Sequence, residues 1–284
     1  MSVHATSGRH GPNDTPHPPA SDAPVVTPPM GSIPGVPSRV ADMTHQLLRQ
    51  GRRYFGSAGA ALTHLVSDAS CESPFGASVT SKGLLGERAT SLLVRSWMEK
   101  EAPNAVLCDS VHIRGHNESV DDHGNIDAGD TDHVLVMGHE VIIIDSKQWK
   151  DRMVYTVNAK GAVLRKRSTR VKRASSFPGG AVHAGGAKHM WGSYLISSAH
   201  VSSIVVLTSP HVFVVRDAHW KKAPFRLIRL CDLADYLSYR RSHMSHNNTT
   251  MIDASLVSQI ATCCIKPYDV FAGNIDTVRA FQRL

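Results

Sequence analysis

The sequence predicts a mixed α/β fold, and three observations support this prediction. Segments with helical spacing of apolar residues alternate along the chain with short, strongly apolar segments. Apolar residues make up 42% of the 284 residues, which is enough for a real hydrophobic core. The segment from Thr131 to Lys147 contains two short apolar runs joined by a tight turn, as expected for a hairpin. We therefore expect a mixed central sheet flanked by helices.

The N-terminal part of the chain differs in composition from the rest. Residues 1–40 are rich in Pro, Ser, His, Gly and Asp and contain few large apolar residues. Such a segment cannot offset its ordering entropy by burial, so it is expected to be a disordered, Pro-rich tail. Residues 41–80 are expected to be a lead-in of helix and loop, with Leu47, Leu48, Tyr54 and Phe55 in its partly helical portion.

Residues 81–230 are expected to form the main domain. Apolar residues recur at helical spacing from Gly83 to about Lys100, and Pro103 prevents this helix from extending further. A strand is expected at Ala105–Ile113. The following stretch, Gly115–Asp130, is rich in Asp, Gly, Asn and His and is expected to be a loop before the hairpin.

The second half of the chain alternates in the same way. A basic, glycine-rich stretch runs from Arg165 to Gly186, and residues 231–284 are expected to be a helical C-terminal extension. Further strands are expected at Val154–Val157, Ala162–Leu164, Ser203–Leu207, Val212–Val215 and Arg226–Leu230, and helices at Lys188–Ser198, at Cys231–Tyr239 and twice from about Thr250.

Charge and composition narrow the class of protein. Lys and Arg exceed Asp and Glu by 31 to 24, a net charge of +7, which favours an anionic partner such as nucleic acid or a membrane surface. No apolar run is long enough to span a bilayer, and the N-terminus lacks the basic and apolar regions of a secretory signal. The five cysteines have irregular spacing and indicate neither a disulfide framework nor a paired zinc motif. These observations favour a cytoplasmic protein that does not enter membranes.

Charged residues gather at one end of the predicted hairpin. Asp132 stands at the entrance of the first strand, and Asp145 and Lys147 stand at the exit of the second. Asp145 and Lys147 share strand parity, so both point to one face of the sheet, and the hairpin can bring Asp132 beside them. Two carboxylates and a lysine at one sheet edge are typical of metal-assisted phosphodiester cleavage.

The expected cofactor is Mg²⁺, or Mn²⁺ in its place, because such ions prefer oxygen ligands and retain several waters. Asp132 and Asp145 would hold the ion, and the backbone carbonyl of Ser146 could complete the set. Lys147 would orient a metal-bound water and stabilise charge in the transition state. Glu87, on the preceding helix, could supply another oxygen or support the ligands. The alternative is that Asp145 and Lys147 merely end a strand in solvent.

These residues resemble the motifs of the NERD (nuclease-related) domain, which is similar to the PD-(D/E)xK nuclease superfamily. The resemblance covers roughly residues 80–215, and it rests on Gly86-Glu87, the segment Thr131–Val136 and the segment Val141–Trp149. It implies a restriction-endonuclease-like α/β core, a divalent metal and a DNA substrate. It also implies an active site made of Glu87, Asp132, Asp145 and Lys147, with Gln148 assisting.

A dense basic run follows the predicted site and could neutralise a phosphate backbone. The alternative is a solvated basic loop. The run consists of Arg165, Lys166, Arg167, Arg170, Lys172 and Arg173.

The function expected from the sequence is metal-dependent hydrolysis of DNA phosphodiester bonds. RNA stays open as a substrate, and the oligomeric state is not predicted. The alternative is a catalytically inactive module on the same fold that binds DNA or a protein. The glycines between Ser175 and Gly186 lack the sequence of a nucleotide-hydrolysing P-loop, and no G-x-S-x-G element indicates a serine hydrolase. The tryptophans Trp149, Trp191 and Trp220 are expected to pack in or beside the core.

Overall fold

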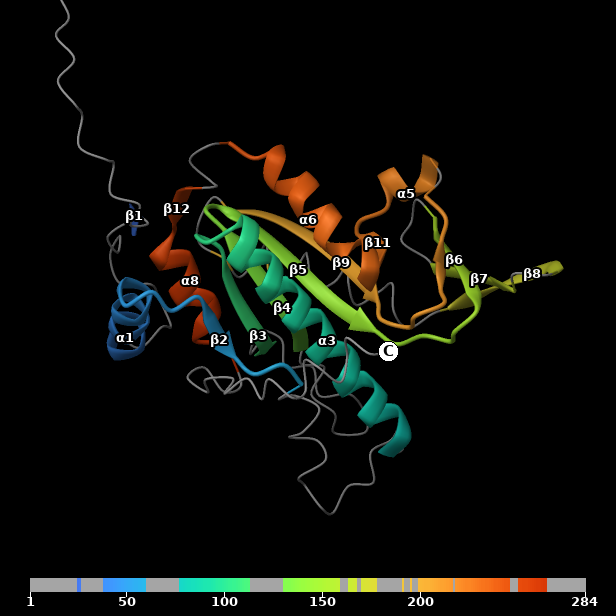
Figure 1. Ribbon diagram of the computed structural model, residues 1–284, viewed down its shortest axis with the longest axis horizontal. Coiled ribbons are helices and arrows are strands. Elements are labelled where there is room, and N and C mark those ends of the chain that lie inside the picture. The colour runs from blue at the N-terminus through green and yellow to red at the C-terminus, as the bar shows by residue number, and fades with distance from the viewer. Residues whose placement is uncertain are drawn as a thin grey trace, which may run out of the picture.

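The fold is built around a six-stranded mixed sheet with the strand order β11-β9-β5-β4-β3-β2. The computed structural model describes residues 25–26, 38–59, 77–112, 130–158, 163–167, 170–177, 191, 195, 199–216, 218–245 and 250–264. Helices cover both faces of the sheet, so the predicted mixed α/β fold with a central sheet between helices is confirmed (Figure 1). The strands are β2 (Tyr54–Gly56), β3 (Val106–His112), β4 (Asp130–Met137), β5 (Glu140–Lys147), β9 (His200–Leu207) and β11 (Arg226–Arg229).

The predicted hairpin is confirmed as β4 and β5 in the middle of this sheet. Met137 pairs with Glu140, and His133 pairs with Ile144. The two residues between the strands form a tight turn, and Gly138 has a φ of 57°, which a glycine adopts without steric cost. Strand β9 lies parallel to β5 along its whole length, from Glu140 to Lys147. Strands β5 and β9 therefore each have a neighbouring strand on both sides, and both carry almost continuous apolar runs.

Helix α3 (Ala77–Glu101) packs across one face of the sheet together with α6 (Leu233–Ser242). The sequence predicts a start only at Gly83, because the Ser and Thr residues before it lack apolar spacing, whereas the helix begins at Ala77. The helix ends just before Pro103, as predicted. Alternate strand residues such as Leu135, Ile142 and Ile144 are completely buried beneath these helices.

The opposite face is covered by α1 (Ser38–Arg49) and α8 (Ala254–Ala261). Asp253 caps α8 by accepting a hydrogen bond from the Leu256 N–H at 2.9 Å. Trp191 is completely buried in the apolar cluster on this face, and its indole N–H donates to Thr131 Oγ1 at 3.0 Å. Its predicted packing role is confirmed.

A second sheet extends from the C-terminal ends of β5 and β9, on the side of the molecule away from α1 (Figure 1). We call it the arm sheet, and its strand order is β10-β6-β7-β8. Its strands are β6 (Met153–Val157), β7 (Val163–Arg167), β8 (Arg170–Phe177) and β10 (Phe213–Val214). The basic run therefore lies in two antiparallel strands and not in a loop. Trp149 and Trp220 pack beside the apolar cluster under this sheet, as expected.

Shorter elements complete the described chain. Strand β1 (Val25–Val26) pairs with β12 (Met251–Ile252), within the segment expected to be a tail. The short helix α5 (Ala218–Lys222) precedes β11, and a 3₁₀ turn, η1 (Leu230–Asp232), precedes α6. The parts of the chain that the structure describes include no helix long and apolar enough to cross a membrane.

Several predicted segments lie outside the described residues. They are most of the tail 1–40, the end of the lead-in segment, the loop before the hairpin up to residue 129, the glycine-rich stretch 178–186, most of the helix predicted at Lys188–Ser198 and the final helical stretch beyond residue 264.

Candidate active site

Three elements bring four charged residues together at the exit of β5. Glu87 comes from α3, Asp132 from β4, and Asp145 and Lys147 from β5. Lys147 Nζ donates to Asp145 Oδ1 at 2.5 Å, as their shared parity predicted. The Ser146 N–H donates to Asp132 Oδ2 at 2.6 Å, which holds the first acid beside the second strand. We call these four side chains the acidic cluster.

Two glycines allow Glu87 to reach the acidic cluster. A Cβ added at Gly86 would lie 2.7 Å from Thr208 Oγ1, so only glycine lets α3 approach the end of β9 this closely. Gly59 has a φ of +80°, and its backbone also hydrogen-bonds Glu87. Gly86 therefore permits the close approach of α3 to β9, and this approach brings Glu87 to the acidic cluster.

The acidic cluster holds more negative charge than its surroundings compensate. Three carboxylates and one ammonium have a formal charge of −2 when all are ionised. Burial, followed by Asp132 and Asp145, raises the pKa of Glu87 to about 9. Burial, with Asp145 adding to it, raises the pKa of Asp132 to about 6, despite the opposing effect of Lys147. In the absence of a cation, Glu87 therefore holds a proton at neutral pH.

Lys147 is the counter-cation of the acidic cluster. Burial alone would lower the pKa of Lys147, but Asp145, Asp132 and Glu87 together raise it above its ordinary value. The side chain therefore stays an ammonium group. It can donate hydrogen bonds and stabilise negative charge, but it does not serve as a proton-accepting base near neutral pH.

One oxygen of the acidic cluster has no protein partner. Asp145 Oδ2 is buried and makes no hydrogen bond, whereas Oδ1 is bound by Lys147. A buried carboxylate oxygen without a donor is costly, and a divalent cation would satisfy it. Within the described ranges, no three His, Cys, Asp or Glu side chains already form a metal cage. Magnesium needs only one or two protein carboxylates because it keeps several waters, so Asp145 and its neighbours fit such an ion.

A buried hydrogen-bond network connects α3 to three strands directly behind the acidic cluster. Asp109 on β3 is completely buried and accepts from Ser91 Oγ at 2.7 Å and from Arg95 Nη2 at 2.7 Å. Its other oxygen lies 2.7 Å from Nδ1 of His133, which is equally buried. Burial by itself would raise the pKa of Asp109, but the hydrogen bond and electrostatic interaction with His133, the charge of Arg95 and the hydrogen bond from Ser91 lower it below its ordinary value.

The network continues from His133 back to α3. His133 Nε2 lies 3.2 Å from Ser146 Oγ, which donates to Thr90 Oγ1 at 2.8 Å, and Thr90 donates to the Gly86 carbonyl at 3.0 Å. Both ring nitrogens of His133 are thus engaged, one with the Asp109 carboxylate and the other with the Ser146 hydroxyl.

The order Asp109, His133, Ser146 has the distances of a hydrolase triad. The chemistry differs because Ser146 is 7% exposed and donates its hydroxyl proton to Thr90. A nucleophilic serine needs an accessible oxygen and a histidine that accepts its proton. The network therefore serves to fix α3, and with it Glu87, against β4 and β5.

The other predicted site residues differ in whether they contact the acidic cluster. Gln148 follows the last residue of β5 and is exposed, and none of the contacts in the described chain joins it to the acidic cluster. Ser146 contributes its N–H to Asp132, while a ligand role for its carbonyl stays a prediction. In the basic run, Arg165 hydrogen-bonds Tyr155, so it is partly occupied within the arm sheet.

Sequence reasoning missed Asp109, Ser91 and Arg95. The available signal was a charged residue in the apolar run of β3, directly after Leu107 and Cys108. On α3, Ser91 and Arg95 follow Glu87 at intervals of four residues, which places them on one side of the helix. A buried charge needs partners, and this helix face supplies them.

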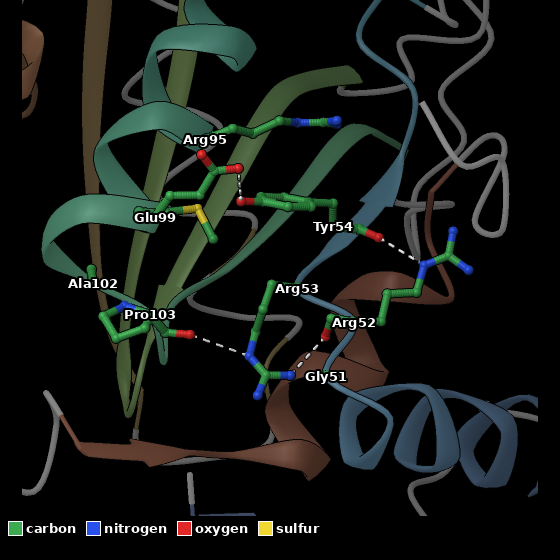
Figure 2. Close-up of a pocket in the computed structure, with 9 residues that line it drawn as sticks. Gly51, Arg52, Arg53, Tyr54, Arg95, Glu99, Ala102 and Pro103 are labelled. Carbon is green, nitrogen blue, oxygen red and sulfur yellow. Dashed lines mark hydrogen bonds between the residues drawn. The ribbon is translucent and has the colours of Figure 1, made fainter. Parts of the chain in front are cut away.

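Arg95 also borders a cavity of about 390 Å³ between the C-terminal part of α3 and the segment Gly51–Tyr54 (Figure 2). Its guanidinium carbon lies 4.7 Å from the centre of the Tyr54 ring, and the Tyr54 hydroxyl lies 3.5 Å from Glu99. Arg53, which also lines the cavity, donates to the carbonyls of Leu48, Arg52 and Pro103. The chain's own acceptors thus engage these cations, and we assign the cavity no ligand.

Comparison with known proteins does not place the chain in a family. No protein-family model matches it, and no curated protein or solved structure matches it either.

Proposed function

We propose that the chain is a divalent-metal-dependent nuclease with a restriction-endonuclease-like core, related to the NERD domain and the PD-(D/E)xK nucleases, which hydrolyses DNA phosphodiester bonds. The observation that carries the proposal is the acidic cluster, in which Glu87, Asp132, Asp145 and Lys147 meet from three separate elements. Its formal charge of −2 matches one Mg²⁺ or Mn²⁺ ion, and Asp145 Oδ2 offers that ion a buried oxygen without a partner.

Each residue has a defined role in this proposal. Asp132 and Asp145 would hold the ion, with Glu87 as a further acid whose carboxylate form the ion would favour. A bound ion would supply Lewis-acid chemistry and lower the pKa of water at the site. Lys147 remains an ammonium and stabilises the negative charge that develops on the phosphate oxygens.

The arm sheet supplies a route for the rest of the substrate. It begins a few residues beyond Lys147, and β7 and β8 contain six cations and no acid. Phosphate groups bound there would continue away from the acidic cluster. Since Arg165 is engaged with Tyr155, we expect it to contribute least among the six.

The test uses purified full-length protein with supercoiled and linear DNA and, in parallel, a single-stranded RNA. Cleavage is expected with Mg²⁺ or Mn²⁺ and not with EDTA, and Asp145→Asn or Lys147→Ala should slow it at least about 100-fold. Asp151→Asn, which alters an acid that binds the nearby His211 N–H, is the matched control and should cleave normally. Cleavage that persists in both cluster variants would refute the assignment.

A second candidate is an inactive module that binds DNA or a protein on the same fold. It is favoured by Lys147, which already neutralises Asp145 without any metal. This candidate predicts salt-sensitive DNA binding with no metal-dependent cleavage.

A further inference from the structure

The arm sheet has one packed face and one face with exposed apolar side chains. Met153, Tyr155 and Val157 of β6 alternate along the strand and are buried with Phe225 and other residues in one cluster. Residues of opposite parity face the other way. Among them Val154 is half-buried, and it pairs with Phe213 of β10 on one side and Lys166 of β7 on the other.

Among the described side chains of this sheet, Phe213 is the most exposed apolar one. It is 55% exposed, and Val215, two residues later, is 44% exposed. Between them Val214 packs against the buried cluster, and the preceding Val212 is almost completely buried. The alternation fixes the direction of Phe213. Together with Val215 and the half-buried Val154, Phe213 presents an apolar surface on this face of the sheet, and such surfaces serve as binding sites.

Phe213 is also held close to the acidic cluster. It follows the end of β9 by six residues, and Val154 follows Lys147 by seven. The two connections are tied together, because Arg152 N–H donates to the His211 carbonyl at 3.1 Å and the Ser209 hydroxyl donates to the Trp149 carbonyl. A fully extended connection of six residues spans at most about 20 Å, which is the length of a few nucleotides.

The charge on the same sheet selects the class of partner. Residues 163–177, which include strands β7 and β8, contain six Arg or Lys residues and no Asp or Glu, and β6 lies between these strands and β10. An aromatic platform on the same sheet as a basic strand pair suits single-stranded nucleic acid. Its phosphates need cations, and its unpaired bases have free faces that stack on aromatic rings. A base inside a duplex is already stacked on both sides and gains nothing from Phe213.

We propose that Phe213 is a stacking platform for an unpaired base, and that the arm sheet binds single-stranded nucleic acid in preference to duplex. The view that this strand is a substrate leading to the acidic cluster rests on the proposed nuclease function. The binding itself does not rest on it.

Fluorescence anisotropy in EDTA separates binding from cleavage. The probes are a labelled single-stranded oligonucleotide and a hairpin duplex of the same number of phosphates. Phe213→Ala should weaken single-strand binding by about 5- to 150-fold and leave the salt dependence unchanged. Phe213→Trp should bind like the wild type. Tyr239→Ala is the matched control, because Tyr239 is 59% exposed on α6, and it should change affinity less than about twofold.

The outcomes distinguish this proposal from the nuclease proposal. Equal losses on single strand and duplex, unchanged binding in Phe213→Ala, or no wild-type binding at low salt would each overturn the stacking platform. Phe213-dependent binding without metal-dependent cleavage would support the platform and refute only the nuclease. Cleavage that is lost in Asp145→Asn, with single-strand binding retained, would support both.

Discussion

Removing the Asp109 carboxylate should destabilise the protein far more than removing a surface acid. Asp109 is completely buried and contacts Arg95, Ser91 and His133 at 2.7 Å each. In Asp109→Ala, the mostly buried Arg95 loses its counter-ion and the buried His133 loses a hydrogen-bond partner. Breaking a buried pair by removing one partner costs about 3–5 kcal/mol, since an uncompensated charge stays behind.

The matched control is Asp232→Ala. Asp232 also binds two arginines, Arg216 at 3.0 Å and Arg229 at 2.7 Å, but these side chains are 50% and 37% exposed. Exposed ion pairs contribute about 0–1 kcal/mol because water and salt screen them. Each variant thus removes a carboxylate that contacts two basic side chains, one buried in the fold and the other near the surface.

The assay is urea denaturation followed by circular dichroism, with thermal unfolding in parallel. The expected loss in Asp109→Ala corresponds to a decrease in Tm of roughly 6–20 °C, against less than about 4 °C for the control. Asp109→Asn, which keeps the shape and one acceptor oxygen, should fall between them. If Asp109→Ala were no less stable than Asp232→Ala, the network behind the acidic cluster would not have the structural role described above.

Three further predictions concern the acidic cluster and the arm sheet. In EDTA, Glu87 binds a proton in the folded state up to about pH 9 but in the unfolded state only up to about 4.5, so the free energy of unfolding should fall as pH rises between these values. Glu87→Gln should remove this decrease when urea denaturation is measured across the pH range. An equal decrease in both proteins would contradict the prediction. Gly86→Ala should slow metal-dependent cleavage at least about tenfold, since its Cβ would lie 2.7 Å from Thr208 Oγ1 and displace Glu87. Adding Thr208→Ala should restore part of the rate, and no restoration in a cleavage assay would argue against this contact. Replacing Lys172 and Arg173 by Ala should reduce the slope of log Kd against log salt concentration by about 1–2 in anisotropy titrations, and an unchanged slope would exclude them as phosphate contacts.

The hairpin and the charges at its end could be predicted because they are local. Two apolar runs around a tight turn specify β4 and β5, and strand parity alone places Asp145 and Lys147 on one face. The start of α3 and the strand pairing of the basic run could not be predicted in this way. Residues Ala77–Lys82 lack apolar spacing, and the arginines and lysines of β7 and β8 obscure the strand pattern.

The sequence by itself determined which chemical groups the chain carries and the local elements that present them, since helical and strand periodicity act over a few residues. Only the tertiary structure decided that Glu87 meets Asp132, 45 positions later, and that Asp109, His133 and Ser146 share one buried network with α3. Burial then raised the pKa of Glu87 and left Asp145 Oδ2 without a partner. These properties depend on distances between remote segments and on exclusion of water, which arise only when helix and sheet pack together.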